Sequence, residues 1–185
     1  FKFFTIAQIP ELKNRVVTMN GVSKSYAMTG WRIGYAAGPK EIIKAISKIQ
    51  SQSTTNPSSI SQAAAVEALN GNQDFISIRA KAFEERRDFV VNTLNSINGI
   101  KCLKPDGAFY VFPSCKNLIG KKDINGKKIE NDTDFVQSLL ENNGVAVVQG
   151  SAFGLEGYFR ISYATSMENL KKALKKISDF CESLK

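Results

Sequence analysis

Short apolar runs alternate along this chain with longer segments in which apolar residues recur at helical spacing. Residues 15–19 and 31–37 are rich in β-branched or aromatic side chains, and they predict two strands. The first strand is expected to end at Asn20-Gly21 and the second at Gly38-Pro39. Alternation of strand and helix patterns indicates an α/β or α+β architecture.

Two helices are predicted after the second strand. The first begins at Pro39, and its apolar positions are Ile42, Ile43, Ile46 and Ile49. The second follows Asn56-Pro57 and ends at Gly71, with Ser59 and Gln62 at the spacing of a capping box.

A longer helix is predicted over residues 74–97, where Asn98-Gly99 ends it. At 1.5 Å per residue it would be ~35 Å long, a length typical of helices that bridge two domains. The boundary is placed within it, near residues 82–87. The predicted domains are therefore 1–85 and 86–185.

The second half of the chain predicts short strands at residues 108–112, 145–148 and 158–163, together with two helices. The last helix begins near Thr165 and Glu168, again at capping-box spacing. Its apolar stripe consists of Leu170, Ala173, Leu174, Ile177, Phe180 and Leu184.

Composition narrows the classes of partner. The 185 residues are 43% hydrophobic and 23% charged, and no apolar run reaches the length of a membrane span, so no membrane association is expected. The net charge of +8 raises nucleic acid as a partner. The lysine clusters at 121–128 and 171–176 lack interleaved aromatics or a nucleic-acid motif, so they are interpreted as solvated surface and no nucleic-acid partner is predicted. The excess of positive charge is also compatible with an anionic small ligand.

The number and spacing of cysteines and histidines limit which catalytic and metal-binding groups the chain can form. The thiols of Cys102, Cys115 and Cys181 are isolated, which favours a reducing cytoplasm over a disulfide framework. The chain contains no histidine, so neither a zinc site nor a Ser-His-Asp centre is predicted. Lys, Arg, Tyr, Ser and carboxylates remain as candidate catalytic groups.

Residues 21–34 form the candidate reactive segment, a loop of small residues with Lys24 and Arg32 eight positions apart. Lys24 is expected to be buried between core strands, where the neutral amine that attacks carbonyl groups is favoured. Arg32 offers a planar fork of donors suited to a phosphate. Pyridoxal phosphate carries an aldehyde and a phosphate on one ring, so it is the predicted cofactor.

This segment resembles the lysine-attachment signature of class I aminotransferases, in which an Arg follows the Lys by eight positions. Asn56-Pro57 before a helix, the Gly-Ala-Phe-Tyr strand within 105–113, and 150–154 leading into 159–162 also match the family. The resemblance covers nearly the whole chain and is closest to bacterial aspartate aminotransferases.

The resemblance implies a role for each candidate residue. Lys24 would form the Schiff base with pyridoxal phosphate and then move the substrate proton. Arg32 would bind the cofactor phosphate, and Arg160 the substrate α-carboxylate through two parallel hydrogen bonds. Ser23 would touch the phosphate, or serve only as a small packing residue. Tyr26, Trp31 and Tyr110 are interpreted as packing residues.

For the whole protein, the resemblance implies the C-terminal part of a fold-type I pyridoxal-phosphate-dependent transferase. Residues 1–85 would be the end of the large-domain mixed sheet, and 86–185 an α+β small domain. The implied reaction moves the amino group of an amino acid, aspartate, to a 2-oxo acid, 2-oxoglutarate, in a cytoplasmic homodimer.

Some features of the family pattern are not found in this chain. The groups that contact the pyridine nitrogen and ring oxygen lie upstream in the family, so the chain is expected to be part of a longer protein and inactive alone. Ser51 stands where some aspartate aminotransferases carry an Arg for the distal carboxylate, and Gln149 where relatives often have Pro. The alternatives are an aminotransferase for another amino acid or prephenate, a lyase on the same scaffold, or the cofactor-sensing domain of a transcription regulator.

Overall fold

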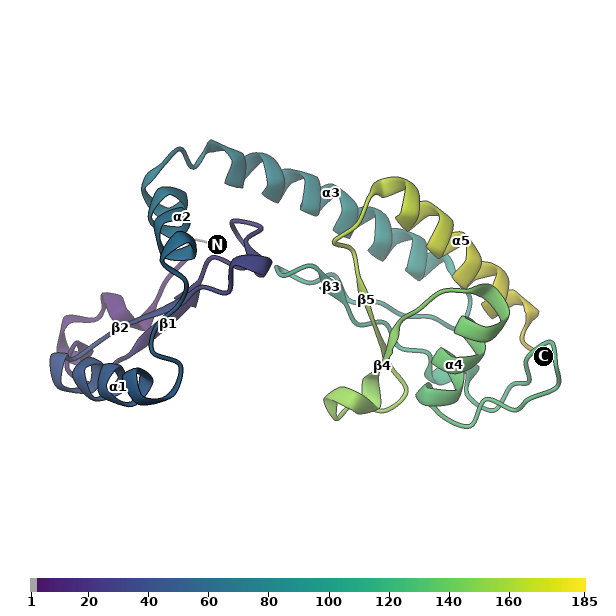
Figure 1. Cartoon of the computed structure of the whole chain (residues 1–185). Coiled ribbons are helices and arrows are strands. Elements are labelled where there is room, and N and C mark those ends of the chain that lie inside the picture. Colours follow the sequence, from purple (N-terminus) through teal and green to yellow (C-terminus); the bar gives the residue numbers. More distant parts are fainter. Residues whose placement is uncertain (1–2) are drawn as a thin grey trace. The chain divides into compact units, whose positions relative to one another are not determined.

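A computed structural model describes residues 3–185 as a mixed α/β chain (Figure 1). It divides into two compact units, Phe1–Ser77 and Ile78–Lys185, and the division falls inside the long helix α3 (Asp74–Ser96). Each unit has its own buried cluster of apolar side chains.

The first unit is built on an antiparallel ribbon of β1 (Thr18–Gly21) and β2 (Gly34–Ala37), followed by α1 (Lys40–Ser53) and α2 (Ser59–Asn70). Both strands begin three residues later than the sequence predicted. The first strand does end at Asn20-Gly21, but these residues form its last two positions and do not follow it, since Asn20 pairs with Tyr35.

The core of the first unit is small. Its buried residues are Val22, Met28, Ile33 and Ala65, so the β1–β2 loop, residues 22–33, packs with α2. The isoleucine stripe predicted on α1 is present, but α1 has no buried residue, and Ile42, Ile46 and Ile49 are exposed. A periodic stripe predicts which face of a helix is apolar, whereas burial also requires a partner segment.

The second unit contains a three-stranded antiparallel sheet in the order β3–β5–β4. Its strands are β3 (Tyr110–Val111), β4 (Val148–Gln149) and β5 (Phe159–Ser162). Alternate residues point to opposite faces. Val111, Phe159 and Ile161 are buried in the core on one face, and Arg160 belongs to the other.

Helices complete this unit. They are α3, α4 (Asp132–Asn143) and α5 (Met167–Ser183). The stripe predicted on the last helix is confirmed: Leu170, Leu174, Ile177 and Phe180 are buried, and Ala173 packs against the same core. None of the helices described is long and apolar enough to cross a membrane.

Two predicted helix caps are displaced by one residue. The N-cap of α5 is Ser166, whose hydroxyl accepts the Asn169 N–H at 3.2 Å, and not Thr165. The residue before α2 is Ser58, and it makes no side-chain cap bond. Gly71 ends α2 as predicted.

Asp123 joins a turn to α4 in the second unit. Its carboxylate accepts the N–H groups of Asn125 and Lys127 at 2.9 Å each, the Ser138 hydroxyl at 3.1 Å and the Asn142 amide at 3.1 Å. Burial by itself raises the pKa of Asp123, but these donors outweigh it and hold the pKa below its usual value of 3.8. The ionised carboxylate therefore stabilises the folded state.

Replacement of Asp123 by asparagine is expected to lower the urea midpoint of unfolding at pH 7, because the amide cannot accept all four hydrogen bonds. The folded-state pKa is lowered, so the stabilisation is complete above pH ~4 and disappears as the pH falls through the folded pKa. Midpoints of the wild type and variant should thus converge in acid. A constant difference at every pH would contradict this role.

Candidate active site

The candidate reactive residues of the first unit lie on the loop that joins β1 to β2, residues 22–33. Gly21 pairs with Gly34, so the loop closes one end of the ribbon. Val22, Met28 and Ile33 are buried, and they anchor the loop near its two ends and at its middle. The loop is therefore attached to the small core and not free in solvent.

The backbone of this loop is held in an unusual form. Ala27 and Arg32 have φ of 54° and 56°, the left-handed region that residues other than glycine seldom adopt. The Ala27 N–H donates to the Lys24 carbonyl at 3.0 Å, and the Trp31 N–H to the Met28 carbonyl at 3.2 Å. Such strain costs about 1–3 kcal/mol per residue and is concentrated at functional sites, so it supports this loop as a candidate site.

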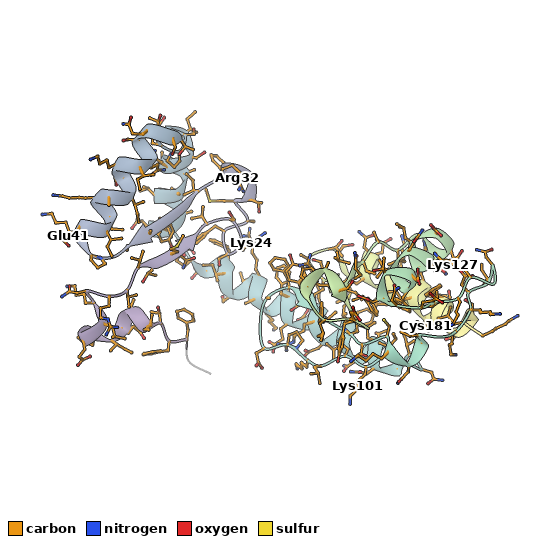
Figure 2. All side chains as sticks on the ribbon, turned by 90° about the horizontal axis from the view of Figure 1, so that it is seen from below. Lys24, Arg32, Glu41, Lys101, Lys127 and Cys181 are labelled. Atoms are coloured by element: carbon orange, nitrogen blue, oxygen red, sulfur yellow. The ribbon has the colours of Figure 1, made fainter. Side chains whose placement is uncertain are left out.

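Lys24 lies on the exposed side of the loop, close along the chain to buried Val22 (Figure 2). The expectation that it would be buried is wrong for the residues described. It assumed that the flanking strands were core strands, whereas the four residues of β2 are all exposed. An amine on a fixed turn remains placed to react with a carbonyl group of a ligand.

Arg32 and Ser23 are joined through Thr29. Arg32 Nη1 donates to the Thr29 carbonyl oxygen at 2.9 Å, and the Thr29 hydroxyl donates to the Ser23 carbonyl oxygen at 3.0 Å. A guanidinium has five N–H donors, and this bond uses one of them. Ser23, Lys24 and Arg32 thus lie on one loop, in which hydrogen bonds through Thr29 connect Arg32 to the backbone of Ser23.

Arg160 belongs to the second unit, on β5. Its guanidinium carbon lies 4.3 Å from the ring centre of Tyr110 and 4.4 Å from that of Phe153. The residue is half-buried, and among residues 3–185 no carboxylate forms an ion pair with it. A half-buried guanidinium that no carboxylate of the described residues neutralises is suited to an anionic ligand.

The three thiols are buried and free. Burial raises the pKa of Cys102 to about 11, and those of Cys115 and Cys181 to about 12. Since only a thiolate is a strong nucleophile, these residues do not provide candidate chemistry near neutral pH. The described residues also contain no cluster of ligands for a metal ion.

A protein-family model of class I and II aminotransferases matches residues 2–177. The chain belongs to this family. The aspartate aminotransferase of Rhizobium meliloti strain 1021 is 60% identical over 185 residues, which are all of this chain and 45% of that protein. A probable aspartate/prephenate aminotransferase of Rhizobium leguminosarum bv. phaseoli is 61% identical over 186 residues, 46% of its length.

Solved structures of family members have the same fold. The crystal structure of the Rhizobium meliloti aspartate aminotransferase has a TM-score of 0.96 at 59% identity and covers the whole chain, which spans 46% of it. The crystal structure of the Thermotoga maritima aspartate aminotransferase has a TM-score of 0.84 at 39% identity. The match covers 98% of this chain and 44% of the Thermotoga maritima chain. The chain is thus a part of the fold-type I aminotransferase architecture and spans less than half the length of these relatives.

Within this chain of the aminotransferase family, the structure overturns one aromatic expectation and confirms another. Trp31 is 43% exposed and not a core residue, because it lies in a short turn before β2 begins at Gly34. Tyr26 does pack against the core of its unit, and its hydroxyl donates to Gln73 at 3.0 Å.

The contacts of Arg160 with Tyr110 and Phe153 were not anticipated from the sequence. Tyr110 could have been found, because antiparallel pairing of its strand with β5 puts it on the face of Arg160. Phe153 carries no such signal, since it lies in a turn at Gly150–Phe153.

Proposed function

We propose that this chain is part of a pyridoxal-phosphate-dependent aminotransferase that moves the amino group of aspartate to 2-oxoglutarate. The observation that carries the proposal is the strained β1–β2 loop, which carries both Lys24 and Arg32 in a member of the aminotransferase family. The direct test is amino transfer by the complete enzyme between these two substrates, followed through the oxaloacetate released.

The donor set of the loop fits the cofactor. Lys24 supplies an amine for the aldehyde of pyridoxal phosphate, and Arg32 supplies a planar cation for its phosphate. The Ser23 hydroxyl is a further candidate contact of the phosphate. Pyridoxal phosphate, when bound, supplies the electron-withdrawing ring that stabilises negative charge at the substrate Cα.

In this proposal, Lys24 has two roles. Its amine would hold the cofactor through the aldehyde carbon, and the same amine, when free, would take the proton from the substrate Cα. Arg160 binds the α-carboxylate with two parallel N–H···O bonds, which fixes the orientation of that Cα.

The substrate class rests on relatives named as aspartate or aspartate/prephenate aminotransferases. Ser51 lies on α1, where its hydroxyl donates to the Lys48 carbonyl at 2.8 Å, so it does not replace an arginine for the distal carboxylate. That carboxylate would be bound by another part of the enzyme. Prephenate or another amino acid is the second candidate, and kcat/KM for each donor distinguishes them.

The wider organisation also belongs to the proposal. Residues 1–85 would complete a large cofactor-binding domain and 86–185 the small domain, in a cytoplasmic homodimer. The relatives named above are aminotransferases, and none of them supports the alternative of a transcription regulator.

Replacement of Arg32 by alanine is expected to weaken retention of pyridoxal phosphate about 10- to 100-fold, because a charge-assisted contact with the phosphate is lost. Equilibrium dialysis of the complete enzyme measures this dissociation constant. Arg15→Ala removes the same charge from an exposed position before β1 and is the matched control. Equal retention in both variants would exclude Arg32 from the phosphate site.

A further inference from the structure

The guanidinium of Arg160 lies against two aromatic rings. Its central carbon is 4.3 Å from the ring centre of Tyr110 and 4.4 Å from that of Phe153. Both distances are well inside the ~6 Å range of cation–π attraction. A planar cation in contact with two rings has fewer orientations open to it than the same side chain in solvent.

The sheet determines where Tyr110 lies. Tyr110 on β3 pairs with Ser162 on β5, so Arg160 is its diagonal neighbour on the same face. The next residues, Val111 and Ile161, face the opposite way into the core. Slippage of Tyr110 away from Arg160 would therefore require the loss of a buried pair.

A separate set of hydrogen bonds and close contacts holds the turn that carries Phe153. The buried carboxylate of Asp132, 1% exposed at the start of α4, accepts the Ser151 N–H at 2.6 Å. The Gly150 N–H donates to the Tyr158 carbonyl at 2.7 Å, and a Cβ at Gly150 would collide with the Leu155 carbonyl and Tyr158. Phe153 is 48% exposed, yet its backbone is fixed at both ends of the turn, since the Gly154 N–H donates to Ser151 at 3.0 Å.

We propose that Tyr110 and Phe153 are positioning residues for the substrate carboxylate, acting through Arg160; this inference rests on the proposed function. Contact with a ring occupies a face of the guanidinium, whereas a carboxylate binds along its edge with two in-plane N–H···O bonds. The rings thus limit the orientations of the guanidinium, so that its edge can face the α-carboxylate. We name this pair of rings the aromatic clamp.

The clamp acts on binding of the carboxylate and not on proton transfer. Loss of either ring in the holoenzyme, by Tyr110→Leu or Phe153→Leu, should raise KM for both the amino acid and the 2-oxo acid about tenfold, with kcat within about threefold of wild type. The dissociation constant of succinate, a carboxylate that cannot be transaminated, should rise by the same factor in calorimetry.

Matched variants separate the ring contact from general damage to the fold. Tyr110→Phe and Phe153→Tyr keep each ring and should restore wild-type KM. Tyr35→Leu removes an exposed tyrosine ring from β2 in the first unit and should leave KM unchanged. An amine substrate without an α-carboxylate should react equally well with wild type and Phe153→Leu.

The outcomes also separate this inference from the proposed function. Unchanged KM and succinate affinity in both leucine variants, together with a raised KM in Arg160→Lys, would overturn the clamp and leave the function intact. Unchanged KM in Arg160→Lys itself would remove the carboxylate site. If the phenylalanine and tyrosine rescues raise KM as much as the leucine variants, the rings are not the cause, and the clamp is also overturned.

Discussion

The Lys24→Ala enzyme is expected to lose at least a thousandfold in kcat while still binding pyridoxal phosphate non-covalently. The variant lacks both the amine that attaches the cofactor and the base that moves the Cα proton, and a positioned general base alone contributes about 10²- to 10⁴-fold. Arg32 is retained, so the phosphate keeps its cation. Steady-state transamination measures the loss, and dialysis measures the cofactor that remains bound.

Lys40→Ala is the matched control for this variant. Lys40 is an exposed lysine at the start of α1 in the same unit, so its removal changes the net charge equally. It should retain wild-type kcat. A Lys24→Ala enzyme whose kcat stays within tenfold of wild type would show that another group carries the proton transfer.

The Arg160→Lys enzyme is expected to show the second large effect, a KM raised about 10- to 100-fold for amino acid and 2-oxo acid alike. Lysine keeps the charge but cannot make two parallel in-plane hydrogen bonds to a carboxylate. Since both substrates carry the α-carboxylate, both values should rise together. Initial rates over a range of each substrate measure the change.

Arg86→Lys provides a control of the same chemical kind. Arg86 is half-buried on α3, and its guanidinium carbon lies 5.2 Å from the ring centre of Phe83. Like Arg160, Arg86 belongs to the second unit and contacts an aromatic ring, but it has no proposed contact with the substrate. An equal rise in KM in both variants would mean that the effect of Arg160 is structural.

Local sequence patterns predicted which helices and strands form better than they predicted which side chains are buried. The helical spacing of apolar residues predicted α5 and its buried stripe, because a few turns of sequence are enough to show the periodicity of a helix. Asn20-Gly21 was expected to follow the first strand but forms its last two residues, since a turn-forming pair can continue a strand when a partner strand accepts it. The caps of α2 and α5 were each missed by one residue because neighbouring serines and threonines compete for the same position.

Burial could not be predicted locally, because it depends on segments distant in the chain. Lys24 and Trp31 were expected inside a core and are exposed, since their ribbon has two strands and an exposed β2. The aromatic clamp was missed for the same reason. Three segments meet at Arg160, and only the pairing of β5 with β3 and β4 brings them together.

The attachment of the cofactor to Lys24 is the measurement on which the proposed chemistry depends most directly. Borohydride reduces the bond between an attachment lysine and pyridoxal phosphate to a stable linkage, which survives digestion and can be located by peptide mapping of the complete enzyme. The expected result is a single phosphopyridoxyl adduct, on the peptide that contains Lys24. A reduced adduct on any other lysine, with Lys24 unmodified, would contradict the assignment.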